Sequence, residues 1–259
     1  MEPVDLAVDV RGSGRRTLVL LHGLGSCRDH FEEVASTLEG RCRLVLPDLR
    51  GHGGSPAARV ERLEDYVADL VPIVRAHAPV ALCGTSFGGD LALFVWNAAP
   101  DAVEGVCVVE PLLDMDALWR WAYRSAWTRR GAYRRLVSPF FERNLERLVA
   151  LMAEYPLTAD LDEPARRRNA EAHLRASEET LHSTLRVLRA PPSRLGRPSG
   201  TEARALVVRA LRSPACPAPE AAQLAERLGG EVGTVDAGHC VQLAAPRAFA
   251  DVLSGWLSP

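Results

Sequence analysis

The chain has 259 residues, a formal net charge of −2 and 47% hydrophobic residues, a composition that is ordinary for a soluble globular protein. This near-neutral charge provides no long-range attraction to nucleic acid or to an anionic membrane, and no apolar run is long enough to span a bilayer. All 31 basic residues are arginine, which excludes mechanisms that need a lysine nucleophile or a lysine-bound cofactor.

The first part of the chain alternates between short apolar runs and segments with helical spacing. The runs that predict strands lie at 4–10, 17–21, 44–47, 79–83 and 103–109. Segments 31–38, 63–76 and 91–98 predict the helices between them. Pro72 is expected to break the second of these helices in its interior or to end it early. This alternation predicts an α/β fold with a mostly parallel, doubly wound sheet and helices on both faces.

The middle of the chain has a different character. From 114 to about 190 the spacing is helical without a clear strand, and aromatic residues gather near its start at Trp119, Trp121, Tyr123, Trp127 and Tyr133. A linker rich in proline and glycine occupies 190–200, after which strands at 205–209 and 231–235 alternate with helices at 218–228 and 249–256. We therefore predict an α/β core at 1–111 and 201–259, interrupted by a helical cap and linker at 112–200.

Ser86 lies in the segment Gly84-Thr85-Ser86-Phe87-Gly88, between a predicted strand and a predicted helix. A serine flanked in this way is typical of a sharp turn that presents a nucleophilic hydroxyl. His22-Gly23-Leu24-Gly25 and Asp236-Ala237-Gly238-His239 also follow predicted strands. Because the carboxyl ends of parallel strands meet at one edge of a sheet, we expect the serine, the late histidine and the glycine-rich loop to lie together.

These segments, together with Pro47-Asp48-Leu49-Arg50-Gly51-His52-Gly53-Gly54-Ser55, resemble the α/β-hydrolase superfamily in order and interval. The resemblance implies that Ser86 is the nucleophile and His239 its base. It also implies an oxyanion hole made by the backbone N–H groups of Leu24 and Phe87. In the family, residues equivalent to His22 and Gly23 support the oxyanion loop. A cap is expected where the helical insertion interrupts the core.

The acid that would orient the histidine departs from the usual pattern. The family commonly places an aspartate in the loop after the strand at 205–209, where this chain has Arg212, which cannot accept a hydrogen bond. Some members carry the acid at the end of the preceding core strand, and Glu110 occupies that position here. We predict Glu110 as the acid, with Asp114 and Asp116 as lesser candidates. The other account is a degraded triad with an altered activity.

The resulting prediction is a serine hydrolase that cleaves an ester or thioester of a small, largely apolar molecule, free or linked to a carrier or to coenzyme A. The six cysteines are scattered without a C-x-x-C pair, which favours buried thiols and a reducing, cytoplasmic compartment. No cofactor or metal is predicted, because His173 and His182 have no closely spaced ligand partners. A role in secondary metabolism is a further hypothesis.

Three other activities fit the same motifs. A lyase could use the serine and the histidine to eliminate an acyloxy group such as acetate, and a C–C hydrolase would also keep the serine. A hydrolase-like protein that has lost its triad would only bind its ligand. A dehalogenase is disfavoured because its nucleophile is a carboxylate at the position of Ser86.

Overall fold

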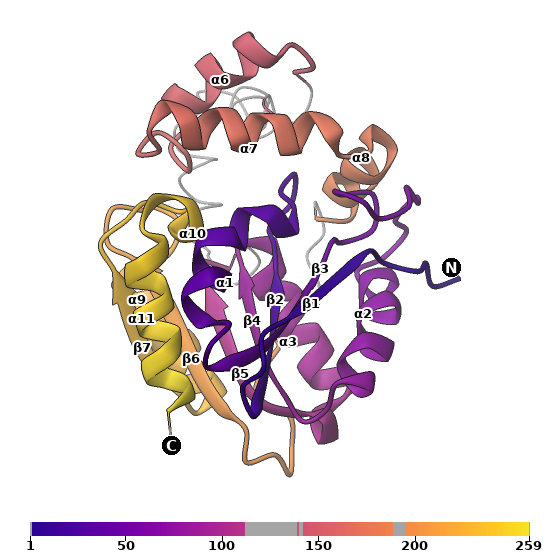
Figure 1. The fold of residues 1–259 in the computed structure, drawn as a ribbon, viewed down its shortest axis with the longest axis vertical. Helices are drawn as coiled ribbons and strands as arrows, with labels where there is room; N and C mark the ends of the chain where they lie inside the picture. Colours follow the sequence, from indigo (N-terminus) through magenta and orange to yellow (C-terminus); the bar gives the residue numbers. More distant parts are fainter. Residues whose placement is uncertain (1, 112–138, 140–141, 189–194, 259) are drawn as a thin grey trace.

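The computed structural model of this chain describes residues 2–111, 139, 142–188 and 195–258. These residues hold one seven-stranded sheet in the order β1-β3-β2-β4-β5-β6-β7 (Figure 1). Strand β1 pairs antiparallel with β3, and every other neighbouring pair is parallel. The strands are β1 (Val8–Arg11), β2 (Arg16–Leu21), β3 (Cys42–Pro47), β4 (Val80–Thr85), β5 (Val103–Val109), β6 (Arg204–Ala210) and β7 (Glu231–Val235). The predicted α/β class is confirmed.

The central strands are apolar without interruption because both faces of the sheet are covered. Successive side chains of a strand point to opposite faces. In β2, Leu18 and Leu20 belong to one buried cluster, whereas Val19 and Leu21 belong to the cluster on the other face. A strand that is covered on both sides therefore lacks the alternation of polar and apolar residues that a half-exposed strand shows.

Helices pack on both faces of the sheet (Figure 1). One face is covered by α2 (Glu64–Ala76), α3 (Phe87–Ala98) and α9 (Ala218–Leu228), whose apolar residues share a cluster with that face. The other face is covered by α1 (Glu32–Leu38) and α11 (Pro246–Leu257). Short turns complete the core: the 3-10 helices η1 (Arg28–Phe31) and η2 (Pro100–Ala102), and the helix α10 (Val241–Ala244).

The predicted break at Pro72 does not occur, because α2 continues through this residue to Ala76. A proline inside a helix costs about 3 kcal/mol through its missing N–H and its steric clash. On the buried side of α2, Leu70 and Val74 are at most 1% exposed, and burial of such side chains contributes about 1.5–3 kcal/mol each. Pro72 itself is exposed, so the helix keeps its packed face and tolerates the proline on the solvent side.

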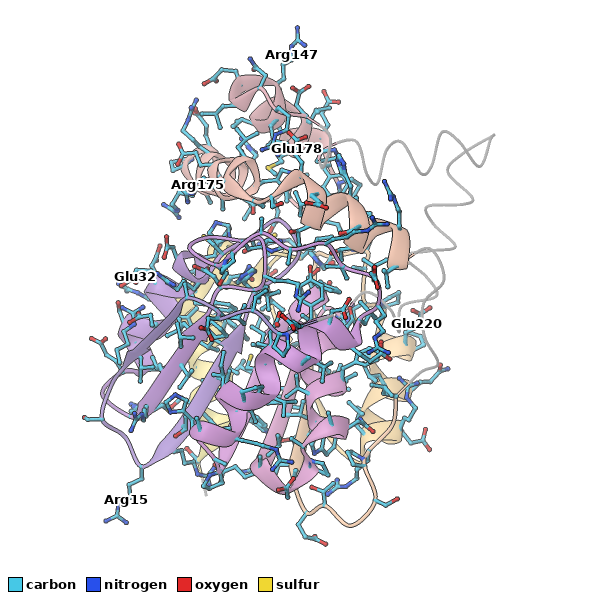
Figure 2. All side chains as sticks on the ribbon, turned by 90° about the vertical axis from the view of Figure 1, so that its right-hand side faces the viewer. Arg15, Glu32, Arg147, Arg175, Glu178 and Glu220 are labelled. Atoms are coloured by element: carbon cyan, nitrogen blue, oxygen red, sulfur yellow. The ribbon has the colours of Figure 1, made fainter. Side chains whose placement is uncertain are left out.

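The helical insertion lies between β5 and β6, where it forms a cap over the sheet edge at which the parallel strands end (Figure 1). Its described helices are α6 (Leu145–Glu154), α7 (Glu163–Arg175) and α8 (Glu178–Val187). Helices α6 and α7 pack around Leu148, Met152 and Ala170, and Figure 2 shows Arg147 at the outer tip of the cap, directed away from the sheet. The predicted aromatic group at 119–133 and the first half of the predicted linker lie outside the described residues.

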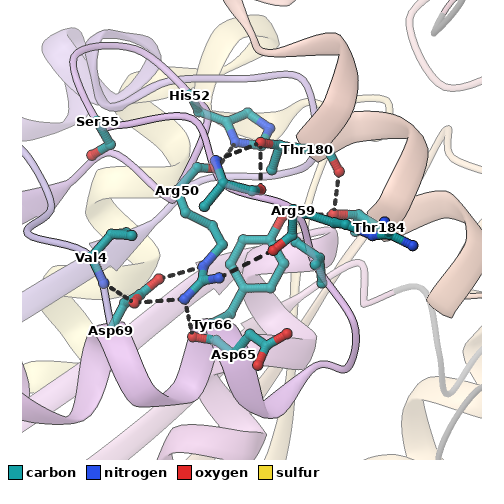
Figure 3. Close-up of polar contacts among 12 residues, drawn as sticks. Val4, Arg50, His52, Ser55, Arg59, Asp65, Tyr66, Asp69, Thr180 and Thr184 are labelled. Atoms are coloured by element: carbon teal, nitrogen blue, oxygen red, sulfur yellow. Dashed lines mark hydrogen bonds and ion pairs between the residues drawn. The ribbon is translucent and has the colours of Figure 1, made fainter. Parts of the chain in front are cut away.

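A buried ion pair connects the loop after β3 with α2 (Figure 3). The fully buried guanidinium of Arg50 donates to both carboxylate oxygens of Asp69, from Nε at 2.6 Å and from a terminal nitrogen at 2.8 Å. In the same region, the Tyr66 hydroxyl and Thr184 Oγ1 share a hydrogen bond of 2.8 Å. The backbone N–H of Ser177 donates to Gly51 O at 2.7 Å. These bonds attach α8, and with it one end of the cap, to the core.

Candidate active site

Ser86 occupies a sharp turn between β4 and α3. Its φ of 54° and ψ of −125° lie in a region that residues with a side chain rarely adopt. The backbone crowds closely here: a Cβ at Gly84 would lie 2.0 Å from Gly88 O, and a Cβ at Gly88 would lie 2.2 Å from Leu21 O. Only glycine fits at either position. The strand–turn–helix context that the G-x-S-x-G segment needs is therefore present.

Glu110 and His239 contact each other at the same sheet edge. His239 Nδ1 lies 3.3 Å from Glu110 Oε2, and the two residues are 5% and 0% exposed. Glu110 is held from two sides, since its N–H donates to Val208 O at 3.1 Å and its Oε1 accepts from Ala210 N at 2.7 Å. With a proton on Nδ1 donated to Oε2, the Nε2 of His239 is left to accept a proton.

Two further observations bear on this carboxylate. Glu110 has a φ of 51°, so it shares with Ser86 the left-handed backbone that, outside glycine, is concentrated at functional sites. The side chain of Arg212 is 52% exposed and pairs with Asp236 at 3.0 Å. Asp114 and Asp116, the lesser candidates, lie outside the described residues. The structure thus brings Glu110 to His239.

The glycine-rich loop at 22–25 passes beside the serine. A Cβ at Gly23 would lie 3.2 Å from the Cβ of Ser86, so the residue that follows, Leu24, is next to the turn. Phe87 is the first residue of α3, and the N–H groups of a first helical turn have no partner within the helix. The loop that carries Leu24 and the helix start that carries Phe87 therefore both lie beside Ser86.

Two buried histidines hold this loop in place. His22 Nε2 accepts from the N–H of Leu49 at 3.0 Å, and His52 Nε2 accepts from the N–H of Gly25 at 3.0 Å. Burial lowers the pKa of both imidazoles, that of His52 to about 4, so both rings are neutral at pH 7. The two residues therefore connect the loop at 22–25 with the loop after β3, which agrees with the supporting role expected of His22.

The nearby thiols are poor nucleophiles. Burial, together with the Glu110 carboxylate, raises the pKa of Cys216 to about 12. Burial and the carboxylates of Asp160 and Glu110 raise the pKa of Cys240 to about 12. Both thiols are therefore protonated at neutral pH. Among the residues that the structure describes, no three His, Cys, Asp or Glu side chains are grouped as metal ligands.

Comparison with known proteins supplies the family. Residues 18–252 match the model of a family described as the alpha/beta hydrolase family. The chain belongs to this alpha/beta hydrolase family. Among curated relatives of this alpha/beta hydrolase, the lipase LipV of Mycobacterium tuberculosis is 28% identical over 99% of both chains. A pimeloyl-[acyl-carrier protein] methyl ester esterase of Chromobacterium violaceum is 35% identical, but the match spans only 57% of each chain.

The solved structures agree on the fold of this alpha/beta hydrolase. The enol-lactonase of Burkholderia xenovorans LB400 has a TM-score of 0.78 at 20% identity and covers 98% of this chain and 96% of its own. An identity this low shows the shared fold alone. Family and curated relatives together place the protein among the hydrolases. In the described parts of the chain, none of the helices has the length and apolar character to cross a bilayer.

Proposed function

We propose that this alpha/beta hydrolase is a serine hydrolase that cleaves an ester or thioester of a small, largely apolar molecule through an acyl-enzyme. The observation that carries the proposal is the 3.3 Å contact between His239 Nδ1 and Glu110 Oε2 on the sheet edge that also carries the strained Ser86 turn. A nucleophile, a base and a carboxylate that orients the base are the three parts that acyl transfer by serine requires.

In this mechanism, Ser86 Oγ attacks the substrate carbonyl carbon while His239 Nε2 takes the hydroxyl proton. Glu110 accepts the Nδ1–H and stabilises the imidazolium. The N–H groups of Leu24 and Phe87 donate to the oxyanion, a contribution of about 3–4 kcal/mol per donor. The alkoxide or thiolate leaves with the proton from His239. Water then attacks the acyl-enzyme by the same route, which releases the acid and restores the Ser86 hydroxyl.

The substrate class has two supports. Two partly buried apolar side chains, Leu24 of the loop at 22–25 and Tyr155 of the cap, pack against the hydrophobic cluster that contains Phe87 and Leu157. Such surroundings favour a largely hydrocarbon acyl group over a charged one. The names of the curated relatives, a lipase and a methyl ester esterase, also describe cleavage of ester bonds.

A fluorophosphonate probe and p-nitrophenyl butyrate test the proposal. We expect the wild-type protein to hydrolyse the ester and to carry the probe on the peptide that contains Ser86, and we expect Ser86→Ala to lose both properties. Ser213→Ala is the control, because Ser213 is another serine in a loop after a strand but lies in no proposed catalytic contact; it should behave as wild type. A folded wild-type protein without labelling or turnover would refute the proposal. An alkene product from an acyloxy substrate would instead indicate elimination.

A further inference from the structure

The cap segment between α6 and α7 contacts the loop that carries His239. The Asp160 carboxylate accepts a hydrogen bond from the N–H of Gly238, and the Cys240 thiol donates to Leu157 O at 3.6 Å. These two contacts flank His239 in the sequence, one residue before it and one residue after it. The cap therefore contacts the histidine loop on both sides of His239, through the backbone of Gly238 and through the side chain of Cys240.

The cap segment is itself firmly held. Leu157 is 8% exposed within the main hydrophobic cluster of the core. Thr158 Oγ1 donates to Met152 O at 2.7 Å, which attaches the segment to α6. Arg166 donates to Leu161 O at 2.6 Å, which attaches it to α7. Asp160 lies between these anchors, so its carboxylate is presented to the histidine loop from a fixed backbone.

This carboxylate occupies the space next to position 238. A Cβ at Gly238 would lie 2.1 Å from Asp160 Oδ1, and its three nearest neighbours would all be atoms of the Asp160 carboxyl group. The φ of Gly238 is outside the left-handed region, so the backbone alone would accept another residue. The Asp160 carboxyl group therefore occupies the space that a side chain at position 238 would need.

Arg212 completes this arrangement. Its guanidinium lies 3.0 Å from Asp236 Oδ1 in the histidine loop and 3.8 Å from Asp160 Oδ2 in the cap. Arg212 therefore lies between a carboxylate of the loop and a carboxylate of the cap. This is the residue that stands where the resemblance led us to expect the acid. With Glu110 in contact with His239 from β5, the position after β6 carries a cation that balances the charge of the cap carboxylate.

We propose that Asp160 is a positioning residue that fixes the Gly238 backbone from the cap and so keeps His239 directed toward Glu110 and Ser86. The inference rests on the proposed serine mechanism, since it gives Asp160 a part in that chemistry. A displacement of about 1 Å in a catalytic group can cost about a hundredfold in rate, so partial release of the loop should be visible in kcat.

The test compares three variants of the full chain in ester hydrolysis. We expect Asp160→Ala to lower kcat about tenfold with KM nearly unchanged. Asp160→Asn should retain most of the activity, because its amide oxygen can still accept the Gly238 N–H. Asp162→Ala is the matched control: Asp162 also accepts a backbone N–H, from Ala165 at 2.8 Å, but it caps α7. It should lower thermal stability and leave kcat unchanged.

A second measurement does not depend on activity. Hydrogen exchange of the 236–240 peptide should accelerate in Asp160→Ala and remain as in wild type in Asp162→Ala. Wild-type kcat and exchange in Asp160→Ala would overturn the inference, and so would equal losses of kcat in both alanine variants. Should Asp160→Ala fail to fold, Gly238→Ala is the second variant, because its Cβ would displace the Asp160 carboxylate. We expect Gly238→Ala to lower kcat, and an unaltered kcat in this variant would also overturn the inference. An inactive, unlabelled wild-type protein would refute the serine mechanism, whereas an active one with an unaltered Asp160→Ala refutes only this role.

Discussion

Glu110→Gln is the substitution that tests the proposed site most directly, because it preserves shape and changes the hydrogen-bonding groups. The carboxylate has two neighbours that need an acceptor: the N–H of Ala210 at 2.7 Å and Nδ1 of His239 at 3.3 Å. A glutamine has one acceptor oxygen and one NH2 donor. If the oxygen stays on Ala210, the NH2 faces Nδ1 and favours the tautomer with its proton on Nε2, which cannot accept the proton of Ser86.

The expected loss is large. In a Ser-His-Asp triad, the corresponding change to a neutral amide lowers kcat about 10⁴-fold through the wrong tautomer, which is about 5.5 kcal/mol of activation free energy. The alternative amide orientation leaves the buried N–H of Ala210 without its acceptor, at a cost of about 1–3 kcal/mol, so it offers little relief. We therefore expect Glu110→Gln to lower kcat by about 10³- to 10⁴-fold with native folding intact.

The assay is the rate of p-nitrophenyl butyrate hydrolysis, with the rate of fluorophosphonate labelling as a second readout. Arg212→Ala is the control, because an ion pair with a side chain that is 52% exposed contributes about 1 kcal/mol or less; we expect a loss of about fivefold at most. A folded Glu110→Gln variant within about tenfold of wild type would refute the assignment. A large loss in Asp114→Asn with little in Glu110→Gln would transfer the role to Asp114.

Two stability predictions follow from the loops that support the site. Asp69→Ala removes the carboxylate from the buried guanidinium of Arg50 and should lower the free energy of unfolding by about 3–5 kcal/mol in urea titrations, whereas Asp101→Ala, at an exposed pair, should leave it nearly unchanged. The pKa of His52 is about 4 in the folded protein, below its ordinary 6.5, so the unfolded chain binds more protons between these values. Acidification therefore favours the unfolded chain. The free energy of unfolding should be highest above about pH 6.5 and should decrease as the pH falls toward 4, by about 2 kcal/mol between pH 7 and pH 5. His52→Gln should show a weaker loss over that range; an unchanged pH dependence would contradict the reasoning.

Local chemistry was sufficient to predict most elements of the core. Helix α9 and strand β7 match their predicted bounds, and Gly229, which lies between them, ends the helix in the left-handed conformation at φ 63°. The prediction failed at Pro72, where a local rule was outweighed by burial of the apolar side of α2. Interruption of the core by a helical segment was also visible in the sequence, because the spacing of apolar residues changes there.

The placement of Ser86, the loop at 22–25 and the His239 loop after strands that end at one edge was also predictable, since parallel strands end on the same side of a sheet. Which carboxylate contacts His239 was harder to predict from the sequence. Motif position favoured Glu110, but its contact with His239 depends on the pairing of β5 with β6, which places the Ala210 N–H against its Oε1. Its catalytic role remains a prediction for the variants above.

Asp160 had no signal in the sequence. It is one polar residue in a turn, and its partner Gly238 is 78 residues away along the chain. Apolar periodicity, turn residues and short motifs report on neighbours within a few positions, so they predicted the strands, the helices and the order of the loops on the sheet edge. Contacts between the cap and the histidine loop depend on how two distant segments pack against one core, and that arrangement exists only in the folded chain.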